Sequence, residues 1–320
     1  MIDIVNLALP YFGLIFIGYA CGKYKDIPES ALAWMDFFIV YVALPALFYG
    51  ILSQTPFEQL AQVNFIAATT LGTACAFAIS FGIAIVLRKG RIGEATIGAL
   101  VGSYGNVGYM GPGLALATLG ASAATPIALI FCFDTLFLFS AVPFLMALRG
   151  QQPISLAAAA LQVLRRIALN PLVIATAIGV LSAAVHFKPP VALDRLLQFL
   201  QGAAAPCALF TLGVTVALRP LQRPPLDVPI LIAIKLIVHP LILFVLLSVL
   251  QITDPVWIGT ALLMAALPPA LNVFVFARYY DRWIEPASSA VLLGTLVSVV
   301  TLTSVMWMVK TGNLPNLLFR

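Results

Sequence analysis

Five polar side chains stand inside long apolar stretches of this sequence, and their types suit the recognition of an anion and the movement of a proton. They are Asn106, Asp134, Lys235, His239 and Asn272. An amide can donate hydrogen bonds to a carboxylate. An ionisable group in an apolar surrounding is costly, so it marks a functional site by default. The sequence therefore predicts a polar site within an apolar protein.

The composition indicates an integral membrane protein. Of the 320 residues, 62% are apolar and only 9% are charged, whereas a soluble domain carries roughly 25% charged residues. The net charge of +5 does not indicate a nucleic-acid partner, because basic residues in a membrane protein mostly mark its cytoplasmic loops.

The sequence holds no recognisable catalytic set. It has two histidines, four cysteines without metal-ligand spacing, and no phosphate-binding loop followed by Lys and Ser or Thr. We therefore expect no enzymatic activity, no cofactor and no metal site.

Apolar segments near the ~20 residues that a crossing needs predict ten membrane spans. Short polar stretches separate them, and the longest connection, 151–166, is expected on the cytoplasmic side, where it could form an interfacial helix. The spans run over 4–22, 33–53, 64–87, 94–118, 124–148, 167–186, 197–217, 229–250, 255–280 and 286–309.

The basic residues predict how the chain is oriented. When the loops are assigned alternately to the two sides, twelve of the seventeen basic residues fall on one side and four on the other, while Lys235 lies within a span. The positive-inside rule places the first group in the cytoplasm. We therefore expect both termini outside, in a multi-pass protein of a bacterial-type inner membrane.

The two halves of the chain resemble each other. With an offset of 161 residues, three of the first four prolines coincide with prolines, and with an offset of 166, Asn106-Val107 coincides with Asn272-Val273. Residues 1–150 and 167–320 would each hold five spans. Because five is odd, the second repeat must enter the membrane inverted, which is typical of secondary transporters.

The fourth and ninth spans are each predicted to break. Residues 102–113 hold five glycines and a proline, with the break at Gly111-Pro112, and the ninth span contains the adjacent pair Pro268-Pro269. Glycine weakens a helix interior, and proline removes a backbone donor. Since inverted repeats bring such breaks together as a crossing, we expect an anion site there, with Asn106 and Asn272 contacting the substrate. The alternative is that both asparagines only cap broken helix ends.

Three ionisable groups are candidates for ion coupling. Asp134 lies in the middle of the fifth span, where a protonatable acid suggests proton coupling. Lys235 and His239 share one face of the eighth span, being four residues apart. Each group also has a structural alternative. Lys235 could extend to the cytoplasmic surface, and His239 could simply fill the space at a kink before Pro240. Asp134 could cap the broken helices.

The two broken spans also carry a resemblance to a known family. The sequence around Gly105-Asn106-Val107-Gly108-Tyr109-Met110-Gly111, together with Leu267-Pro268-Pro269-Ala270-Leu271-Asn272-Val273-Phe274, resembles the auxin efflux carrier family. That family belongs to a superfamily that includes the bile acid:sodium symporters, and its bacterial members resemble malonate permeases and other organic-acid carriers.

The resemblance implies an all-α fold of ten transmembrane helices in two inverted five-helix repeats, with helices 4 and 9 crossed, similar to sodium/proton antiporters. Spans 1, 2, 6 and 7 would form a scaffold that makes a homodimer, and spans 3–5 and 8–10 a transport domain that moves in an elevator fashion. The residues implied to line the substrate site are Gly105, Asn106, Val107, Gly108, Tyr109, Pro268, Pro269, Ala270 and Asn272.

The predicted function is a secondary carrier for a small organic anion, in particular a carboxylate, coupled to protons or driven by the membrane potential. A sodium-coupled symporter of the same architecture is the first alternative. A channel or a membrane sensor is the second, although a sensor would need a soluble output domain.

Overall fold

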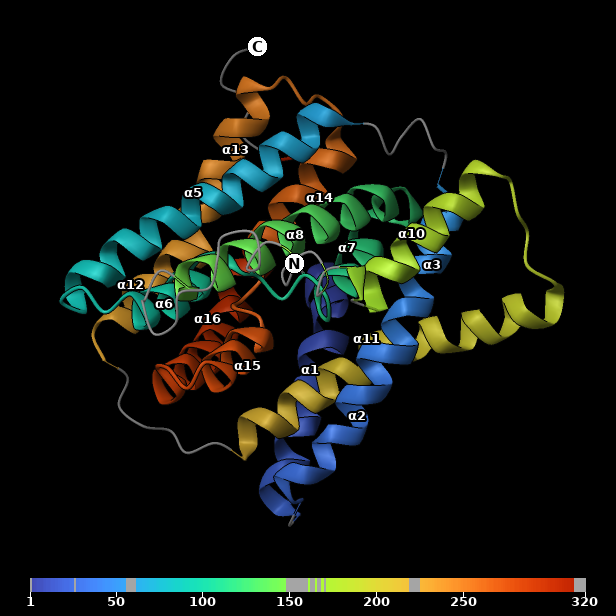
Figure 1. Cartoon of the computed structure of the whole chain (residues 1–320). Helices are drawn as coiled ribbons and strands as arrows, with labels where there is room; N and C mark the ends of the chain where they lie inside the picture. Colours follow the sequence, from blue (N-terminus) through green and yellow to red (C-terminus); the bar gives the residue numbers. More distant parts are fainter. Residues whose placement is uncertain are drawn as a thin grey trace. The chain divides into compact units, whose positions relative to one another are not determined.

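The computed structural model describes residues 2–25, 27–55, 62–147, 161, 165, 168–169, 171–218 and 225–313. Within them the fold is helical, with one isolated pairing of extended backbone. The longer helices are α1 (Ile2–Tyr24), α2 (Leu32–Phe38), α3 (Leu44–Ser53), α5 (Val63–Leu87), α6 (Ile92–Ser103), α7 (Gly111–Leu119), α8 (Ala124–Ala147), α10 (Pro171–Ala184), α11 (Val191–Ala217), α12 (Asp227–Ala233), α13 (His239–Val249), α14 (Pro255–Ala265), α15 (Leu271–Tyr279) and α16 (Ile284–Thr311) (Figure 1).

Each predicted span overlaps a helix or a series of consecutive helices. Six helical stretches in the described part of the chain are long and apolar enough to cross a membrane. Shorter apolar helices include α6, α10 and α14. The all-helical class and its compatibility with a membrane protein are confirmed. The ten crossings and the inverted repeat stay predictions. The connection 151–166 lies almost entirely outside the described residues.

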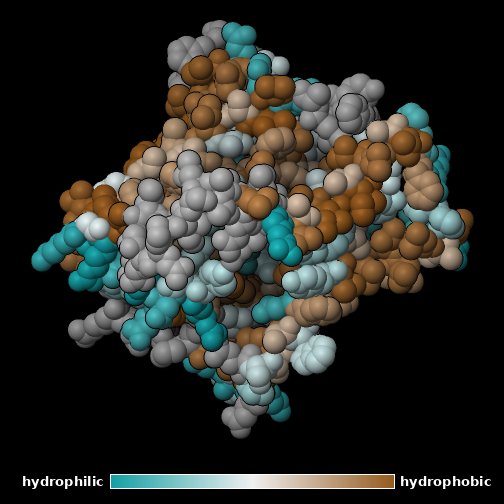
Figure 2. All heavy atoms as spheres, in the orientation of Figure 1, coloured by the Kyte–Doolittle hydropathy of each residue, from teal (hydrophilic) through white to brown (hydrophobic). Residues whose placement is uncertain are grey.

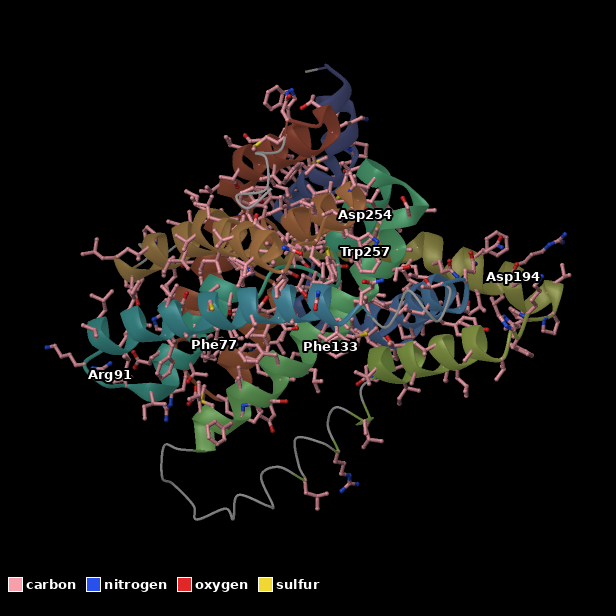
Figure 3. All side chains as sticks on the ribbon, turned by 90° about the horizontal axis from the view of Figure 1, so that it is seen from above. Phe77, Arg91, Phe133, Asp194, Asp254 and Trp257 are labelled. Atoms are coloured by element: carbon pink, nitrogen blue, oxygen red, sulfur yellow. The ribbon has the colours of Figure 1, made fainter. Side chains whose placement is uncertain are left out.

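The surface suits an apolar solvent. Large hydrophobic side chains such as Trp34, Phe199 and Val300 are exposed, and hydrophobic residues cover broad areas of the face in Figure 2. Soluble monomers rarely expose apolar surface on this scale. Several charged residues lie near helix ends, as Arg91, Asp194 and Asp254 do in Figure 3.

The chain divides into two compact units. Unit 1 comprises residues 1–62, 108–132 and 168–220, and unit 2 comprises residues 63–107, 133–167 and 221–320. Unit 1 therefore holds the helices of the expected scaffold, together with α7 and the beginning of α8. Unit 2 holds most of the expected transport domain. The roles of scaffold and transport domain stay predictions.

Small residues allow the helices of unit 1 to approach closely. A Cβ atom on Gly18 of α1 would lie 2.1 Å from the carbonyl oxygen of Phe210 in α11, and one on Gly213 would lie 2.0 Å from that of Ile15. Glycine is therefore required where α1 and α11 cross. Phe48 of α3 also contacts Phe131 at the beginning of α8, with ring centroids 4.2 Å apart.

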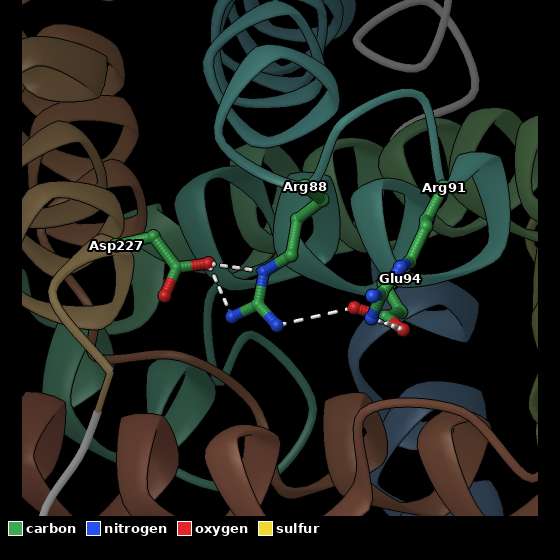
Figure 4. A network of polar contacts seen from close by, with 4 residues as sticks. All are labelled: Arg88, Arg91, Glu94 and Asp227. Atoms are coloured by element: carbon green, nitrogen blue, oxygen red, sulfur yellow. Dashed lines mark hydrogen bonds and ion pairs between the residues drawn. The ribbon is translucent and has the colours of Figure 1, made fainter.

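A charged cluster joins four segments at one end of unit 2. Arg88 donates from Nε to Asp227 Oδ2 at 2.7 Å and from Nη1 to Glu94 at 3.1 Å (Figure 4). Its guanidinium also lies 4.7 Å from the ring centroid of Trp283, which precedes α16. Arg91 pairs with the other oxygen of Glu94. The cluster thus connects α5, α6, α12 and the beginning of α16.

Two spans contain a wider helical turn just before a proline. Residues Ile39–Ala43 and Ile234–Val238 form π-helical segments, each followed within two residues by a proline, Pro45 or Pro240. Proline lacks an N–H and clashes with the preceding turn, so a local π segment accommodates it. Such segments are frequent at functional sites, and the second one carries Lys235.

Candidate functional site

The two broken spans are interrupted where glycine and proline gather. Helix α6 ends at Ser103 and α7 begins at Gly111 with Pro112 in its first turn. Helix α14 ends at Ala265 and α15 begins at Leu271, so that Pro268 and Pro269 lie between them. Each interruption frees backbone groups that must find other partners at membrane depth.

Within unit 2 these freed groups bond to one another. Gly105 and Pro269 pair as an isolated antiparallel bridge. The N–H of Asn106 donates to the Pro268 carbonyl at 2.9 Å, and the N–H of Ala270 donates to the Tyr104 carbonyl at 2.9 Å. The end of α6 and the beginning of α15 are thereby tied together, and both asparagines are held at one junction, called the crossing below.

The side chains of the two asparagines differ in their surroundings. Asn106 is 1% exposed, and no donor among the described residues reaches its side-chain oxygen. Asn272 is half-buried and donates from Nδ2 to the Tyr104 hydroxyl at 3.1 Å. A buried amide oxygen without a partner costs free energy, so the Asn106 oxygen can accept a hydrogen bond from a donor group that enters the crossing.

Lys235 is held inside unit 2. Its side chain is 0% exposed and donates to the carbonyl of Ala265, the last residue of α14. A cation is favourable at a helix C-terminus, where the carbonyls carry partial negative charge. The alternative that Lys235 extends to the cytoplasmic surface is therefore wrong, because a broken helix places an acceptor within its reach.

Gly105 allows this ammonium to approach the crossing. A Cβ atom at Gly105 would lie 3.2 Å from both Cε and Nζ of Lys235 and 3.2 Å from the Met264 carbonyl oxygen. A side chain at this position would therefore require Lys235 or the Met264 carbonyl to shift by a few tenths of an ångström. The positive charge of Lys235 therefore lies directly behind the backbone of the fourth-span break.

Asp134 and His239 belong to the same polar group. Asp134 accepts a hydrogen bond from the Thr73 hydroxyl at 2.7 Å, and His239 Nε2 lies 3.4 Å from the same hydroxyl. His239 Nδ1 lies 3.2 Å from Lys235 Nζ. All four side chains are buried, so α5, α8, α13 and the π segment together enclose a chain of polar groups.

The remaining predicted site residues fall into two groups. Val107 is buried and closes a tight turn through its N–H to Gly105, and Pro269 packs against Gly294 of α16. Gly108, Tyr109, Gly111 and Pro112 belong to unit 1.

Tyr104 and Thr73 are the two residues of the site that the sequence interpretation missed. Tyr104 lies in the glycine-rich stretch, two residues before Asn106, and that position was the available signal. Thr73 is one of many hydroxyl residues in apolar helices, and nothing in the sequence distinguishes it.

Comparison with known proteins identifies the family. The family model described as "Membrane transport protein" matches residues 3–306. The chain belongs to this membrane transport protein family. Its relatives show that the family includes the auxin efflux carriers, as the two broken-span motifs predicted.

Relatives cover nearly all of this membrane transport protein. A protein of Rhizobium meliloti (strain 1021) named "Putative malonate transporter" is 46% identical over 319 residues and is covered, like this chain, over 100% of its length. Auxin efflux carrier component 8 of Arabidopsis thaliana is 20% identical, with 93% of this chain and 95% of the relative covered. An uncharacterized transporter of Methanothermobacter thermautotrophicus is 22% identical, with 90% and 93% covered.

Membership fixes the broad class of the protein. It is a multi-pass membrane transporter, which acts on a small molecule and resides in a lipid bilayer.

Proposed function

We propose that the protein is a secondary carrier that moves a small organic anion, specifically a carboxylate, across a bacterial-type inner membrane. The anion binds at the crossing, between the amides of Asn106 and Asn272. The half of the molecule that contains spans 3–5 and 8–10 then carries it in an elevator motion past a scaffold of spans 1, 2, 6 and 7. The scaffold forms a homodimer, and both termini lie outside.

The observation that carries this proposal is the crossing itself. Backbone groups of both breaks are satisfied by each other, so the side chains of Asn106 and Asn272, whose amide groups can donate to a carboxylate, are held at one junction. The first N–H groups of a helix such as α15 have no partner within the helix and carry partial positive charge. Lys235 adds a buried cation behind Gly105. Together these groups favour a negatively charged ligand.

The name of the Rhizobium relative supports the substrate class. A relative that is 46% identical over its whole length and is named for malonate makes a small dicarboxylate the first ligand to test.

The position of Lys235 favours protons or the membrane potential over sodium as the driving force. In sodium-coupled carriers, half-helix C-termini and unwound carbonyls coordinate the ion. Here the carbonyl at the end of α14 is bonded by the Lys235 ammonium. An inside-negative potential by itself expels an anion, at roughly 2.3 kcal/mol per charge per 100 mV. Transport that stops when sodium is replaced by potassium would favour the sodium-coupled alternative.

Binding of carboxylates to the purified protein tests the proposal. Malonate and a panel of small mono- and dicarboxylates should raise the unfolding temperature in detergent, whereas choline, a cation of similar size, should not. Asn106→Ala and Asn272→Ala should each abolish the shift. Asn64→Ala, which alters an exposed asparagine at the beginning of α5, is the matched control and should retain it.

A shift that persists in both crossing variants would show that the anion binds elsewhere. A shift with choline but with none of the carboxylates would overturn the substrate class.

A further inference from the structure

Thr73 connects the buried acid of unit 2 to its buried bases. Its hydroxyl oxygen lies 2.7 Å from Asp134 Oδ2 and 3.4 Å from His239 Nε2, and the other ring nitrogen of His239 lies 3.2 Å from Lys235 Nζ. Three helical elements, α5, α8 and the region from the π segment into α13, supply the four side chains. The four side chains form one hydrogen-bonded series that runs from Lys235 through His239 and Thr73 to Asp134.

Each group in this hydrogen-bonded series donates to the next one in the direction of Asp134. A lysine ammonium has three donors and no acceptor, so His239 Nδ1 must accept from it. The proton of the neutral imidazole is then on Nε2, which donates to the Thr73 oxygen. The single Thr73 proton is left to donate to Asp134, which accepts it at Oδ2. The neighbours of His239 thus fix its tautomer and give the chain one direction.

We propose that Thr73 relays a proton between Lys235 and Asp134 by way of His239. In this step Lys235 gives a proton to His239 Nδ1, His239 gives its Nε2 proton to Thr73, and Thr73 gives its proton to Asp134. The ammonium and carboxylate become a neutral amine and a carboxylic acid. Net charge is unchanged, and no outside reactant is needed.

This step rests on the proposed function in its proton-coupled form. Two separate charges in an apolar interior carry a large desolvation cost, which their neutral forms avoid. An anion at the crossing stabilises the ammonium of Lys235, and its departure favours the neutral pair. A pH gradient acts on this step when Asp134 passes its proton to water after the anion has left, so substrate release and proton release become linked through Thr73.

The other charged or titratable groups of the described residues around α5 do not belong to the hydrogen-bonded series from Lys235 to Asp134. At the end of α6, the Tyr104 hydroxyl is bonded by Asn272. Glu94 of α6 and Asp227 of α12 are both paired with Arg88. Lys235 and His239 are the groups supplied by the π segment and α13, and Asp134 is the one supplied by α8 within unit 2.

Three variants of α5 distinguish a role of Thr73 in proton transfer from a role in packing. Thr73→Val keeps the shape and removes the hydroxyl, whereas Thr73→Ser restores the hydroxyl. Thr69→Val is the matched control, because Thr69 is buried one turn away and its hydroxyl bonds only carbonyls of its own helix. His239→Gln is a second test, since an amide can occupy the ring's place but does not pass a proton on.

The protein is reconstituted in liposomes, with labelled malonate as the probe. Two rates are measured for each variant: net transport driven by a pH gradient, and exchange of labelled for unlabelled malonate without a gradient. In Thr73→Val and His239→Gln the pH-driven rate should fall at least about tenfold relative to exchange. Thr73→Ser should recover it, and Thr69→Val should match the unmodified protein.

Equal loss of both rates in Thr73→Val, or full pH-driven transport in it, would overturn the role of Thr73. A protein that exchanges malonate but shows no pH-driven transport before any substitution would also overturn it, while leaving the anion carrier intact. Absence of exchange for every carboxylate would instead count against the proposed function.

Discussion

At the level of single residues, hydrogen bonds between groups of the protein fix the side chains of the crossing in the absence of a ligand. Asn272 donates to the Tyr104 hydroxyl, and the Tyr104 carbonyl accepts from Ala270. Tyr104 is thus bonded through both its side chain and its backbone, and it fixes the orientation of the Asn272 amide.

Replacement of Tyr104 by phenylalanine tests this orientation. Tyr104→Phe removes one hydrogen bond, which is worth about 0.5–1.5 kcal/mol, and should weaken carboxylate binding roughly two- to tenfold. Titration of the purified protein with malonate measures the change. Tyr41→Phe, at an exposed tyrosine of the second span, should leave the affinity unaltered. An unchanged affinity in Tyr104→Phe would show that Asn272 needs no such support.

The residues of the site could be predicted from the sequence only in part. The 166-residue offset paired Asn106 with Asn272, and the cost of burial drew attention to Asp134. The burial of Lys235 could not be predicted. Its acceptor is the carbonyl of Ala265, which is available only because α14 ends at the ninth-span break. Thr73 carries no charge, so its partner across the helix interface could not be inferred from α5 alone.

At the level of elements, the arginine cluster holds four segments of unit 2 together. Arg88 and Asp227 are mostly buried, with side-chain exposures of 16% and 5%, whereas Arg91 is largely exposed. Breaking a buried pair leaves an uncompensated charge, which is far more costly than losing a surface pair.

Two arginine variants should therefore behave differently. Arg88→Met should lower the free energy of unfolding by about 3–5 kcal/mol, while Arg91→Met should change it by at most about 1 kcal/mol. Denaturant unfolding in detergent measures both. Similar losses in the two variants would contradict the structural role given to the Arg88–Asp227 pair.

The ninth-span break depends on a close approach from α16. A Cβ atom at Gly294 would lie 2.5 Å from Cδ of Pro269, so Gly294→Ala should push the break out of place and destabilise the protein by about 1–3 kcal/mol. Gly82→Ala in α5 is the control, because nothing lies within 4 Å of its added Cβ. Equal unfolding temperatures for the two variants would show that the break tolerates displacement.

The breaks themselves were predictable, because adjacent prolines and clustered glycines cannot continue a helix. The π segments were not, since proline signals only a disturbance, and the surrounding packing decides whether the helix kinks or widens. The close approach of Gly294 to Pro269 joins segments distant in sequence and likewise has no local signal.

At the level of the whole molecule, hydrophobicity and charge predicted the class of protein, and family membership confirmed a membrane transporter. Among the described residues, each predicted span overlaps at least one helix. The number of crossings and the orientation of the chain depend on the lipid bilayer. Basic loops stay on the cytoplasmic side when the protein is inserted.

Cysteine labelling tests the orientation. In a background without the four native cysteines, Lys188→Cys should react with a membrane-impermeant maleimide on intact spheroplasts. Arg91→Cys should react only after the membrane is permeabilised, because its loop belongs to the basic, cytoplasmic side. Both positions are exposed, so poor access would not explain a failure. The reverse pattern would invert the proposed topology.

The central claim is that the crossing carries a small organic anion across the membrane. Its most direct test is counterflow of labelled malonate into liposomes that contain the purified protein. Saturable counterflow is expected for the unmodified protein and for Asn64→Ala, with a loss of at least about tenfold in Asn106→Ala and Asn272→Ala. Undiminished counterflow in both of these variants would contradict the account.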